Sequence, residues 1–302
     1  MMSKTFPFEL LRPSLLQKAY YITGSFVESE DIVQEAYLKW INLDTQTVTN
    51  PKAYLTRMVV HLAINWKKKQ KLLRSTYYGQ WLPEPVANER ADLTIDSEDT
   101  ITYSLLVILE RLNAKERAVF ILKEAFDYDH NEIADTLEIT PIHSRKLLSR
   151  AKQRIDAQQS ASVPHDEQVA FLNRFQQVIR NGDTAQLETL LREDVVAVSD
   201  GGGKASAGKH PVAGRHQVAR MLMGIYRKFY RDVAVTQIII GGQIALLYWN
   251  DGTIRSCQIF TLNGGRLHKV YFVRNPDKLS TLQKKSAIAV TQLAVYLSDM
   301  EN

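Results

Sequence analysis

The sequence has only one cysteine, Cys257, among 302 residues. A single cysteine excludes an intramolecular disulfide framework and cysteine-rich zinc sites. The apolar runs are far shorter than the roughly 18–20 residues that a membrane span needs. The first residues also lack the apolar run and small-residue cleavage site of a signal peptide. We therefore expect a cytoplasmic protein with no bound metal and no membrane contact.

The overall composition is that of an ordinary globular chain. Hydrophobic residues make up 45% and charged residues 24% of the sequence, which is enough apolar material for packed cores. The length favours two or three domains. The net charge of +5 is modest, but the basic residues are unevenly distributed, so their positions carry more information than their sum.

The first half of the chain shows helical periodicity only. Apolar stripes predict helices over 8–24, 28–42, 51–74, 101–112 and 113–126, and two short helices joined by a tight turn within 128–155. Pro51 and Pro141 suit first helical positions, with Asn50 and Thr140 as N-caps. Pro83 and Pro85 exclude a helix in the acid-rich stretch around them, which we expect to be a linker.

The second half, after a short linker at 158–166, mixes helices and strands. Helices are predicted over 167–181, 183–193, 210–229 and 280–299, and strands over 195–199, 233–240, 243–249, 253–262 and 266–273. Glycine-containing pairs and triplets between the last four strands predict hairpins. We expect an α+β domain in which helices cover one face of an antiparallel sheet and form a cone with a pocket.

Two basic stretches are candidates for nucleic-acid binding. Lysines and an arginine crowd the end of the helix over 51–74, where the alternative is a solvated helix end that suits the helix dipole. The second helix of a candidate helix-turn-helix, the element that enters the major groove in that motif, carries Arg145, Lys146, Arg150, Lys152 and Arg154. The alternative for this pair is a plain helical hairpin.

The stretch SDGGGKASAGKHP, residues 199–211, looks at first like a phosphate-binding loop. Gly203 to Lys209 match G-x-x-x-x-G-K, but His210 stands where Ser or Thr is needed, and Pro211 follows at once. We therefore expect a tight turn with close backbone approach instead of a nucleotide site.

Three segments, in order, resemble bacterial sigma factors of the extracytoplasmic-function (ECF) type. Residues 28–42 are similar to their polymerase-clamp helix, 50–74 to their promoter −10 helix, and 112–155 to the region that binds the −35 element. The resemblance implies a promoter-specificity subunit of bacterial RNA polymerase that needs no cofactor and is not an enzyme. Two positions depart from the family pattern: Glu138 replaces the usual glycine of the turn, and Ser144 replaces an apolar residue or cysteine.

The resemblance also implies roles for individual residues. Asp31, Gln34, Glu35 and Leu38 would bind the clamp of the polymerase β′ subunit, and the −35-binding region would meet the β flap. His61, Asn65, Lys67, Lys68, Lys71 and Arg74 would hold the melted −10 strand. His143, Arg145, Lys146 and Arg150 would approach the duplex −35 element.

Three short motifs resemble those of the ECF subgroup with a fused SnoaL-like domain. They are WLPEP (Trp81, Leu82, Pro83, Glu84, Pro85), DGGGK (Asp200, Gly201, Gly202, Gly203, Lys204) and NPDKL (Asn275, Pro276, Asp277, Lys278, Leu279). The resemblance implies that the fused domain controls sigma activity, with the tryptophan of the stiff WLPEP segment as a docking anchor. We expect alanine at Asp200 or Lys204 to shift activity without unfolding the domain.

We expect sigma region 2 over 1–75, a linker over 76–100, sigma region 4 over 101–158, a linker over 159–166, the SnoaL-like domain over 167–279 and a helical tail over 280–302. One alternative is a helix-turn-helix regulator that works without polymerase. Another is an enzyme that uses Asp200, Asp232 or His268 for proton transfer. A small ligand in the cone is a further alternative.

Overall fold

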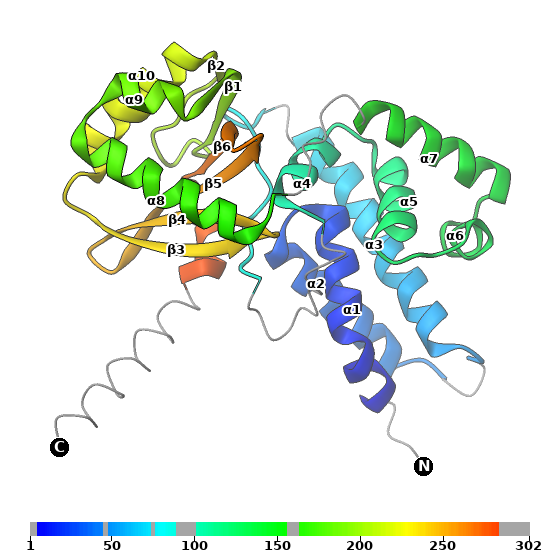
Figure 1. Ribbon diagram of the computed structural model, residues 1–302. Helices are drawn as coiled ribbons and strands as arrows, with labels where there is room; N and C mark the ends of the chain where they lie inside the picture. Colours follow the sequence, from blue (N-terminus) through cyan, green and yellow to red (C-terminus); the bar gives the residue numbers. More distant parts are fainter. Residues whose placement is uncertain (1–4, 45–47, 74–75, 89–100, 156–162, 284–302) are drawn as a thin grey trace. The chain divides into compact units, whose positions relative to one another are not determined.

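A computed structural model describes residues 5–44, 48–73, 76–88, 101–155 and 163–283 (Figure 1). The contacts divide the chain into two compact units, of which the first comprises Met1–Thr76 and Asn88–Gln159. The second comprises Tyr77–Ala87 and Ser160–Asn302. The WLPEP segment, which we expected to be part of a linker, therefore belongs by its contacts to the second unit. Among the described helices none is both long and apolar enough to cross a membrane.

Three helices form the N-terminal part of the first unit: α1 (Thr5–Thr23), α2 (Phe26–Ile41) and α3 (Pro51–Leu73). The Ser25 side chain caps α2, and the Asn50 side chain accepts a hydrogen bond from the Ala53 backbone at the start of α3. Apolar side chains from all three helices are buried, and Trp40 is among the largest of them. The predicted helices at these positions are confirmed.

Four shorter helices complete the first unit: α4 (Tyr103–Leu109), α5 (Ala114–Glu124), α6 (His130–Leu137) and α7 (Pro141–Ile155). Reciprocal capping boxes begin α5 at Asn113 and α6 at Asp129. The helix pair α6–α7 is the predicted helix-turn-helix.

Both departures from the family pattern have a structural consequence. Glu138 ends α6 in the left-handed conformation, with φ of 53°, which is costly for a residue that has a Cβ. Ser144 is fully buried, and its hydroxyl lies 2.9 Å from His130 Nδ1. A polar residue at position 144 thus joins the two helices of the motif by a hydrogen bond in addition to packing.

The second unit contains one six-stranded sheet with the order β2-β1-β6-β5-β4-β3. Its strands are β1 (Leu191–Asp200), β2 (Val212–Ala213), β3 (Ala234–Ile240), β4 (Gln243–Asn250), β5 (Thr253–Asn263) and β6 (Arg266–Val273). The predicted hairpins join β3 to β6 in sequence, and all their pairings are antiparallel. The pairing of β1 with β6 is parallel.

Helices α8 (His165–Asn181), α9 (Thr184–Thr189) and α10 (Arg215–Ile225) pack on one face of this sheet (Figure 1). Phe171, Leu172 and Phe175 of α8 are buried in the core, where Phe175 contacts Phe260 edge to face. The α+β architecture is as expected.

Some predicted boundaries in the second unit were wrong. The expected helix over 183–193 ends at Thr189, because β1 already begins at Leu191. The expected helix over 210–229 begins only at Arg215 and continues as a π-helix, η4 (Tyr226–Tyr230). The expected helix over 280–299 begins earlier, at residue 276, and is described as far as residue 283; residues 284–299 lie outside the described residues.

The strained turn of the helix-turn-helix yields a stability prediction. Glu138→Gly should raise the free energy of unfolding by up to about 1 kcal/mol, because glycine adopts a positive φ without a Cβ clash. Asp135→Gly, an exposed change inside α6, is the control and should lower it by about 1 kcal/mol. Urea denaturation measures both. A Glu138→Gly protein as destabilised as the control would contradict the assigned strain.

Candidate nucleic-acid interface and motif cluster

The second helix of the helix-turn-helix presents a basic face to solvent. His143, Arg145, Lys146 and Arg150 are exposed on α7, while Ser144, Leu147, Ala151 and Ile155 are buried on its other side. Among the described residues, no carboxylate pairs with Arg145, Lys146 or Arg150. Burial and the nearby charge of Arg145 lower the pKa of His130. This face can therefore offer uncompensated positive charge to phosphates.

Two further basic residues of α7 have a different role. Lys152 Nζ lies 2.9 Å from Glu124 Oε1, and Arg154 forms an ion pair with the buried carboxylate of Glu116. Both acids belong to α5. These two cations therefore fasten α7 to α5 and are not free to bind DNA.

Apart from Lys67, the residues expected to hold the −10 strand divide into three groups. Asn65, Lys68 and Lys71 are exposed on α3. His61 Nε2 lies 2.8 Å from the carbonyl oxygen of Thr136 in α6, so its ring is engaged within the unit. Arg74 lies outside the described residues.

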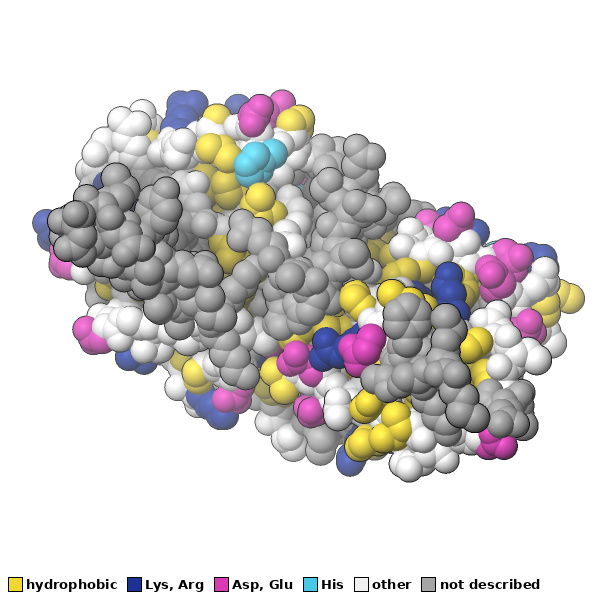
Figure 2. All heavy atoms as spheres, turned by 90° about the horizontal axis from the view of Figure 1, so that it is seen from below, with side chains coloured by type: hydrophobic (Ala, Val, Ile, Leu, Met, Phe, Trp, Pro, Cys, Tyr) yellow, Lys and Arg dark blue, Asp and Glu magenta, His cyan; other side chains and the backbone are white. Residues whose placement is uncertain are grey.

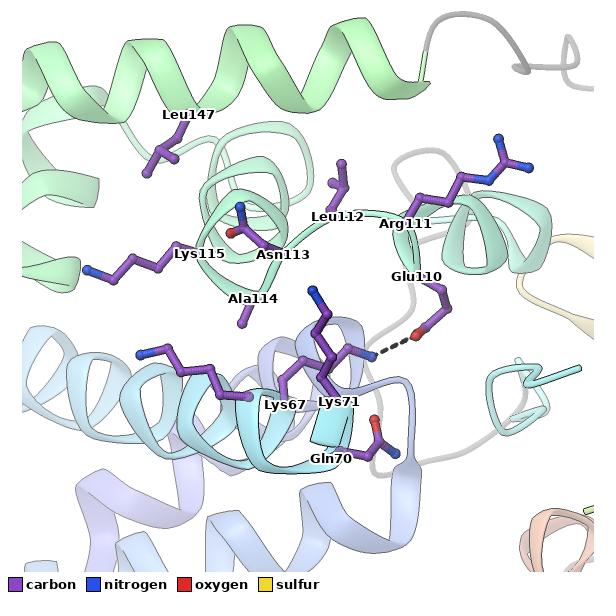
Figure 3. A pocket seen from close by; sticks show the side chains of 11 residues that line it. Lys67, Gln70, Lys71, Glu110, Arg111, Leu112, Asn113, Ala114, Lys115 and Leu147 are labelled. Carbon is purple, nitrogen blue, oxygen red and sulfur yellow. Dashed lines mark hydrogen bonds and ion pairs between the residues drawn. The ribbon is translucent and has the colours of Figure 1, made fainter. Parts of the chain in front are cut away.

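Lys67 does not occupy the exposed position expected of a phosphate-binding residue. Its side chain is buried, with Nζ 2.7 Å from the Thr23 carbonyl oxygen and 2.9 Å from both oxygens of Glu110 (Figure 3). Glu110 also pairs with Arg117, which is fully buried. The network joins α1, α3 and α5, so Lys67 is a structural residue in this arrangement, and its proposed contact with DNA is not supported.

A basic pocket lies beside this network. It has a volume of about 620 Å³, and Figure 3 shows lysines of α3 across from side chains of the segment that joins α4 to α5. Besides Lys67, four cations line it: Lys68, Lys71, Arg111 and Lys115. Glu110 is the acid in its lining, and Lys67 and Arg117 already neutralise that carboxylate. The remaining charge attracts anions.

The residues expected to bind polymerase form one exposed face of α2. Asp31, Gln34, Glu35 and Leu38 are all exposed, and their i, i+3, i+4, i+7 spacing places them on one side of the helix. Leu38 is 50% exposed, and Leu10 and Val27 are also exposed hydrophobic residues of the first two helices. Figure 2 shows hydrophobic side chains among basic and acidic ones on one face of the helical unit. Such mixed surfaces are typical of protein contacts.

The three short motifs meet within the second unit, around the carboxylate of Asp200. Asp200 is fully buried at the end of β1. It accepts hydrogen bonds from Tyr77 Oη (2.5 Å), the Leu82 backbone (2.9 Å), the Gly202 backbone (3.0 Å) and Lys278 Nζ (2.6 Å). We call Tyr77, Leu82, Asp200, Asn275 and Lys278 the motif cluster. It unites WLPEP, DGGGK and NPDKL.

Lys278 completes the motif cluster from the other side. Its Nζ donates to the Leu82 carbonyl oxygen at 2.6 Å and lies 3.3 Å from the centroid of the Trp81 ring. Thr281 also donates a hydrogen bond of 2.8 Å to the buried carboxylate of Glu84. Leu82, Pro83, Glu84 and Pro85 are buried. The WLPEP segment is therefore held by hydrogen bonds, a cation–π contact and apolar burial.

The glycines of DGGGK permit this close approach. A Cβ on Gly202, which has φ of 60°, would stand 2.3 Å from Asn275 Nδ2, a distance that no side chain tolerates. Asn275 Nδ2 in turn donates to Tyr77 Oη at 3.1 Å. The loop is followed by β2 and not by a helix, so it lacks the helix N-terminus of a phosphate loop. The expected tight turn is confirmed.

Sequence reasoning missed Tyr77 of the motif cluster and Thr281, which bonds to Glu84 of the WLPEP segment. Tyr77 lies four residues before Trp81, outside the WLPEP motif. Thr281 lies just beyond NPDKL and belonged to no motif. Proximity to WLPEP and NPDKL was the available signal for both. Lys204, in contrast to the buried residues of the motif cluster, forms an exposed ion pair with Asp277 at 2.5 Å.

The described geometry defines a class of protein: basic helical modules, one of them a helix-turn-helix, fused to an α+β unit. The family model of Sigma-70 region 2 matches residues 8–72, and that of Sigma-70 region 4 matches residues 103–155. The ECF RNA polymerase sigma factor SigJ of Mycobacterium tuberculosis is 30% identical over 90% of this chain and 92% of its own. The chain belongs to the ECF sigma factors, and its second unit is the SnoaL-like domain of the fused subgroup.

Two further comparisons extend over most of the chain. A probable ECF RNA polymerase sigma factor, SigI of Mycobacterium tuberculosis, is 25% identical over 90% of this chain and 93% of its own. The crystal structure of SigJ superimposes with a TM-score of 0.73 and 28% identity, covering 92% of this chain and 98% of that chain. The likeness therefore includes the second unit as well as the sigma regions.

The buried charge of the motif cluster yields the second prediction. Asp200→Asn should destabilise the second unit by about 3–5 kcal/mol, because it leaves the Lys278 ammonium buried without its carboxylate. This expectation replaces the earlier one that changes at Asp200 leave the domain folded. Hydrogen exchange of the β1 and β6 backbone amides measures the effect.

Lys204→Ala is the matched control for Asp200→Asn. It breaks an ion pair whose side chains are 57% and 63% exposed, so the loss should stay below about 1 kcal/mol. Equal exchange rates in both variants would contradict a dominant role for the Asp200–Lys278 pair.

Proposed function

We propose that this sigma factor directs bacterial RNA polymerase to specific promoters, and that its own SnoaL-like unit controls it by holding the segment between the two sigma regions. The observation that carries this proposal is the motif cluster. Region 2 ends near residue 72 and region 4 begins near residue 103, and the chain between them includes the buried WLPEP segment of the second unit.

Promoter binding requires the two sigma regions to act on different DNA elements. His61 is engaged with Thr136, and Lys67 with Glu110, so helix α3 is fastened to the region that carries the helix-turn-helix. In our proposal these contacts belong to a closed form. Polymerase and DNA then favour an open form, in which His61 and Asn65 hold the melted −10 strand, with Lys68 and Lys71 on phosphates.

The exposed faces of the helical unit would make the contacts with polymerase and with the −35 element. The face of α2 that carries Asp31, Gln34, Glu35 and Leu38 would bind the β′ clamp, and the region of α4–α7 would meet the β flap. The basic face of α7 would lie in the −35 major groove. The work would take place in the cytoplasm, with polymerase and DNA.

We do not assign a catalytic role to the second unit. The carboxylate of Asp200 already accepts hydrogen bonds from four donors, so it is not available as a base. Asp232 is exposed in a turn. The pKa of His268 is lowered by burial and by Lys269, and Asp194 Oδ2 lies 4.0 Å from its Nε2.

The third prediction concerns DNA recognition by α7. Arg145→Ala with Lys146→Ala should weaken binding of the holoenzyme to a −35-containing promoter by about 10-fold or more, since a good base contact contributes about 1–3 kcal/mol. Electrophoretic mobility shifts at two salt concentrations measure the loss. Arg220→Ala with Arg266→Ala, two exposed arginines of the second unit, is the control. Equal binding by both double variants would contradict the −35 assignment.

The fourth prediction concerns control by the second unit. Tyr77→Phe removes the hydroxyl that bonds to Asp200 and Asn275 but preserves the ring. Because this loosens the hold on the WLPEP segment, run-off transcription with core polymerase should rise several-fold. Tyr78→Phe is the control, since Tyr78 is 57% exposed and stands outside the motif cluster.

The outcomes of this experiment separate the alternatives. Transcription unchanged by Tyr77→Phe and by deletion of residues 167–302 would contradict control by the second unit. A complete lack of polymerase stimulation on every promoter, for full-length and truncated protein alike, would favour a helix-turn-helix regulator that works without polymerase.

A further inference from the structure

The second unit contains a hollow of about 280 Å³ that no motif accounts for. It lies where η4 meets the end of β4, next to the residue that follows β6. The lining consists of Lys228, Phe229, Tyr230, Val233, Tyr248, Trp249, Asn250, Arg255 and Arg274. We call this space the aromatic hollow.

The charged residues that line the aromatic hollow are all basic. Lys228, Arg255 and Arg274 line it, and the lining includes neither aspartate nor glutamate. In the part of the chain that the structure describes, none of these three cations has a carboxylate partner. Three uncompensated cations around one small space create a potential that favours an anion.

Two buried polar atoms at the aromatic hollow have no hydrogen-bond partner among the described residues. They are the hydroxyl oxygen of Tyr230, a residue that is only 4% exposed, and Nε of Arg274. Each such atom costs about 1–3 kcal/mol when it is left unsatisfied. Another nitrogen of Arg274 donates to the Ser206 carbonyl oxygen, which fixes the guanidinium at the hollow. Arg274 Nε can only donate and the Tyr230 hydroxyl can donate, so one acceptor would satisfy both atoms.

The walls of the aromatic hollow suit a flat ring. The rings of Tyr230 and Tyr248 are stacked at 4.0 Å with an interplanar angle of 26°. The Arg274 guanidinium lies 5.5 Å from the Phe229 ring centroid, and Trp249 is half-buried. Burial and the neighbouring Tyr230 and Tyr226 raise the pKa of Tyr248, which keeps its ring neutral.

We propose that the aromatic hollow binds a small aromatic carboxylate. The carboxylate accepts hydrogen bonds from Tyr230 Oη and the Arg274 guanidinium, and the ring packs against the tyrosine and tryptophan side chains. A cavity of about 150 Å³ already holds benzene, so 280 Å³ has room for a bicyclic acid. A hydrated inorganic anion would leave the aromatic walls without a partner.

Arg274 links the aromatic hollow to the motif cluster. Its backbone N–H donates to the Asp200 carbonyl oxygen at 2.7 Å, and the next residue, Asn275, donates to the same oxygen at 3.0 Å. A ligand on the Arg274 side chain therefore acts one residue from NPDKL. Binding itself is independent of the sigma function, whereas an effect on transcription rests on that proposed function.

The test is calorimetric titration of the full chain with 2-naphthoate. We expect 2-naphthoate to bind at least 10-fold more tightly than the neutral analogue 2-naphthalenemethanol, and inorganic phosphate to show no comparable affinity. Tyr230→Phe and Arg274→Gln should each weaken naphthoate binding at least 10-fold. Tyr226→Phe, which changes a tyrosine outside the lining, should leave the affinity unchanged.

Folding is checked separately from binding. Tyr230→Phe removes an unsatisfied buried hydroxyl, so its melting temperature should stay equal or rise. No binding of 2-naphthoate by a folded full chain would overturn the proposal. So would equal affinity for the neutral analogue, or Tyr230-dependent binding of a dT oligonucleotide in place of the acid. Calorimetry uses no polymerase, so these failures are distinguishable from a failure of the sigma function in transcription.

Discussion

The ion pair between Asp200 and Lys278 is the interaction on which the second unit's hold on the WLPEP segment depends. Both side chains are buried, with Lys278 Nζ 2.6 Å from Asp200 Oδ2. Two buried charges are tolerated only when each is paired and its remaining hydrogen-bonding capacity is used. Here Tyr77 and the Leu82 backbone supply those additional partners. Because both buried charges need partners, Tyr77 and Leu82 of the segment between the sigma regions lie beside Asp200 at the end of β1 and Lys278 in the helix over 276–283.

This constraint limits how far the two sigma regions can move apart. Leu73 and Tyr103 are separated by 30 residue steps, a contour of up to about 100 Å when fully extended. With 77–87 held on the second unit, the contour from Ala87 to Tyr103 is at most about 55 Å. In the proposed function, the second unit would influence promoter binding by shortening the chain that joins the two sigma regions.

Local signals allowed the helices and hairpins to be predicted, whereas contacts between distant residues escaped prediction. The caps at Ser25 and Asp129 act within one turn, and paired glycines fix hairpins between neighbouring strands. The burial of Lys67, by contrast, depends on Glu110, which lies 43 residues away. The sequence around Lys67 is uniformly basic, so periodicity and charge alone could not distinguish it from the exposed Lys68. The parallel pairing of β1 with β6 is likewise a long-range contact without a local signal.

Both units contain a buried charge network. Glu110 joins Lys67 and Arg117 in the first unit, and Asp200 joins Lys278 in the second. Buried ion pairs often contribute less net stability than apolar side chains of the same volume, because desolvation offsets much of the attraction, yet they require an accurate partner. Once the partners separate, water solvates each charge, whereas separated apolar surfaces would favour reassociation or aggregation. In the closed form that we propose, ionic contacts would therefore give a specific geometry without an excessive barrier to opening.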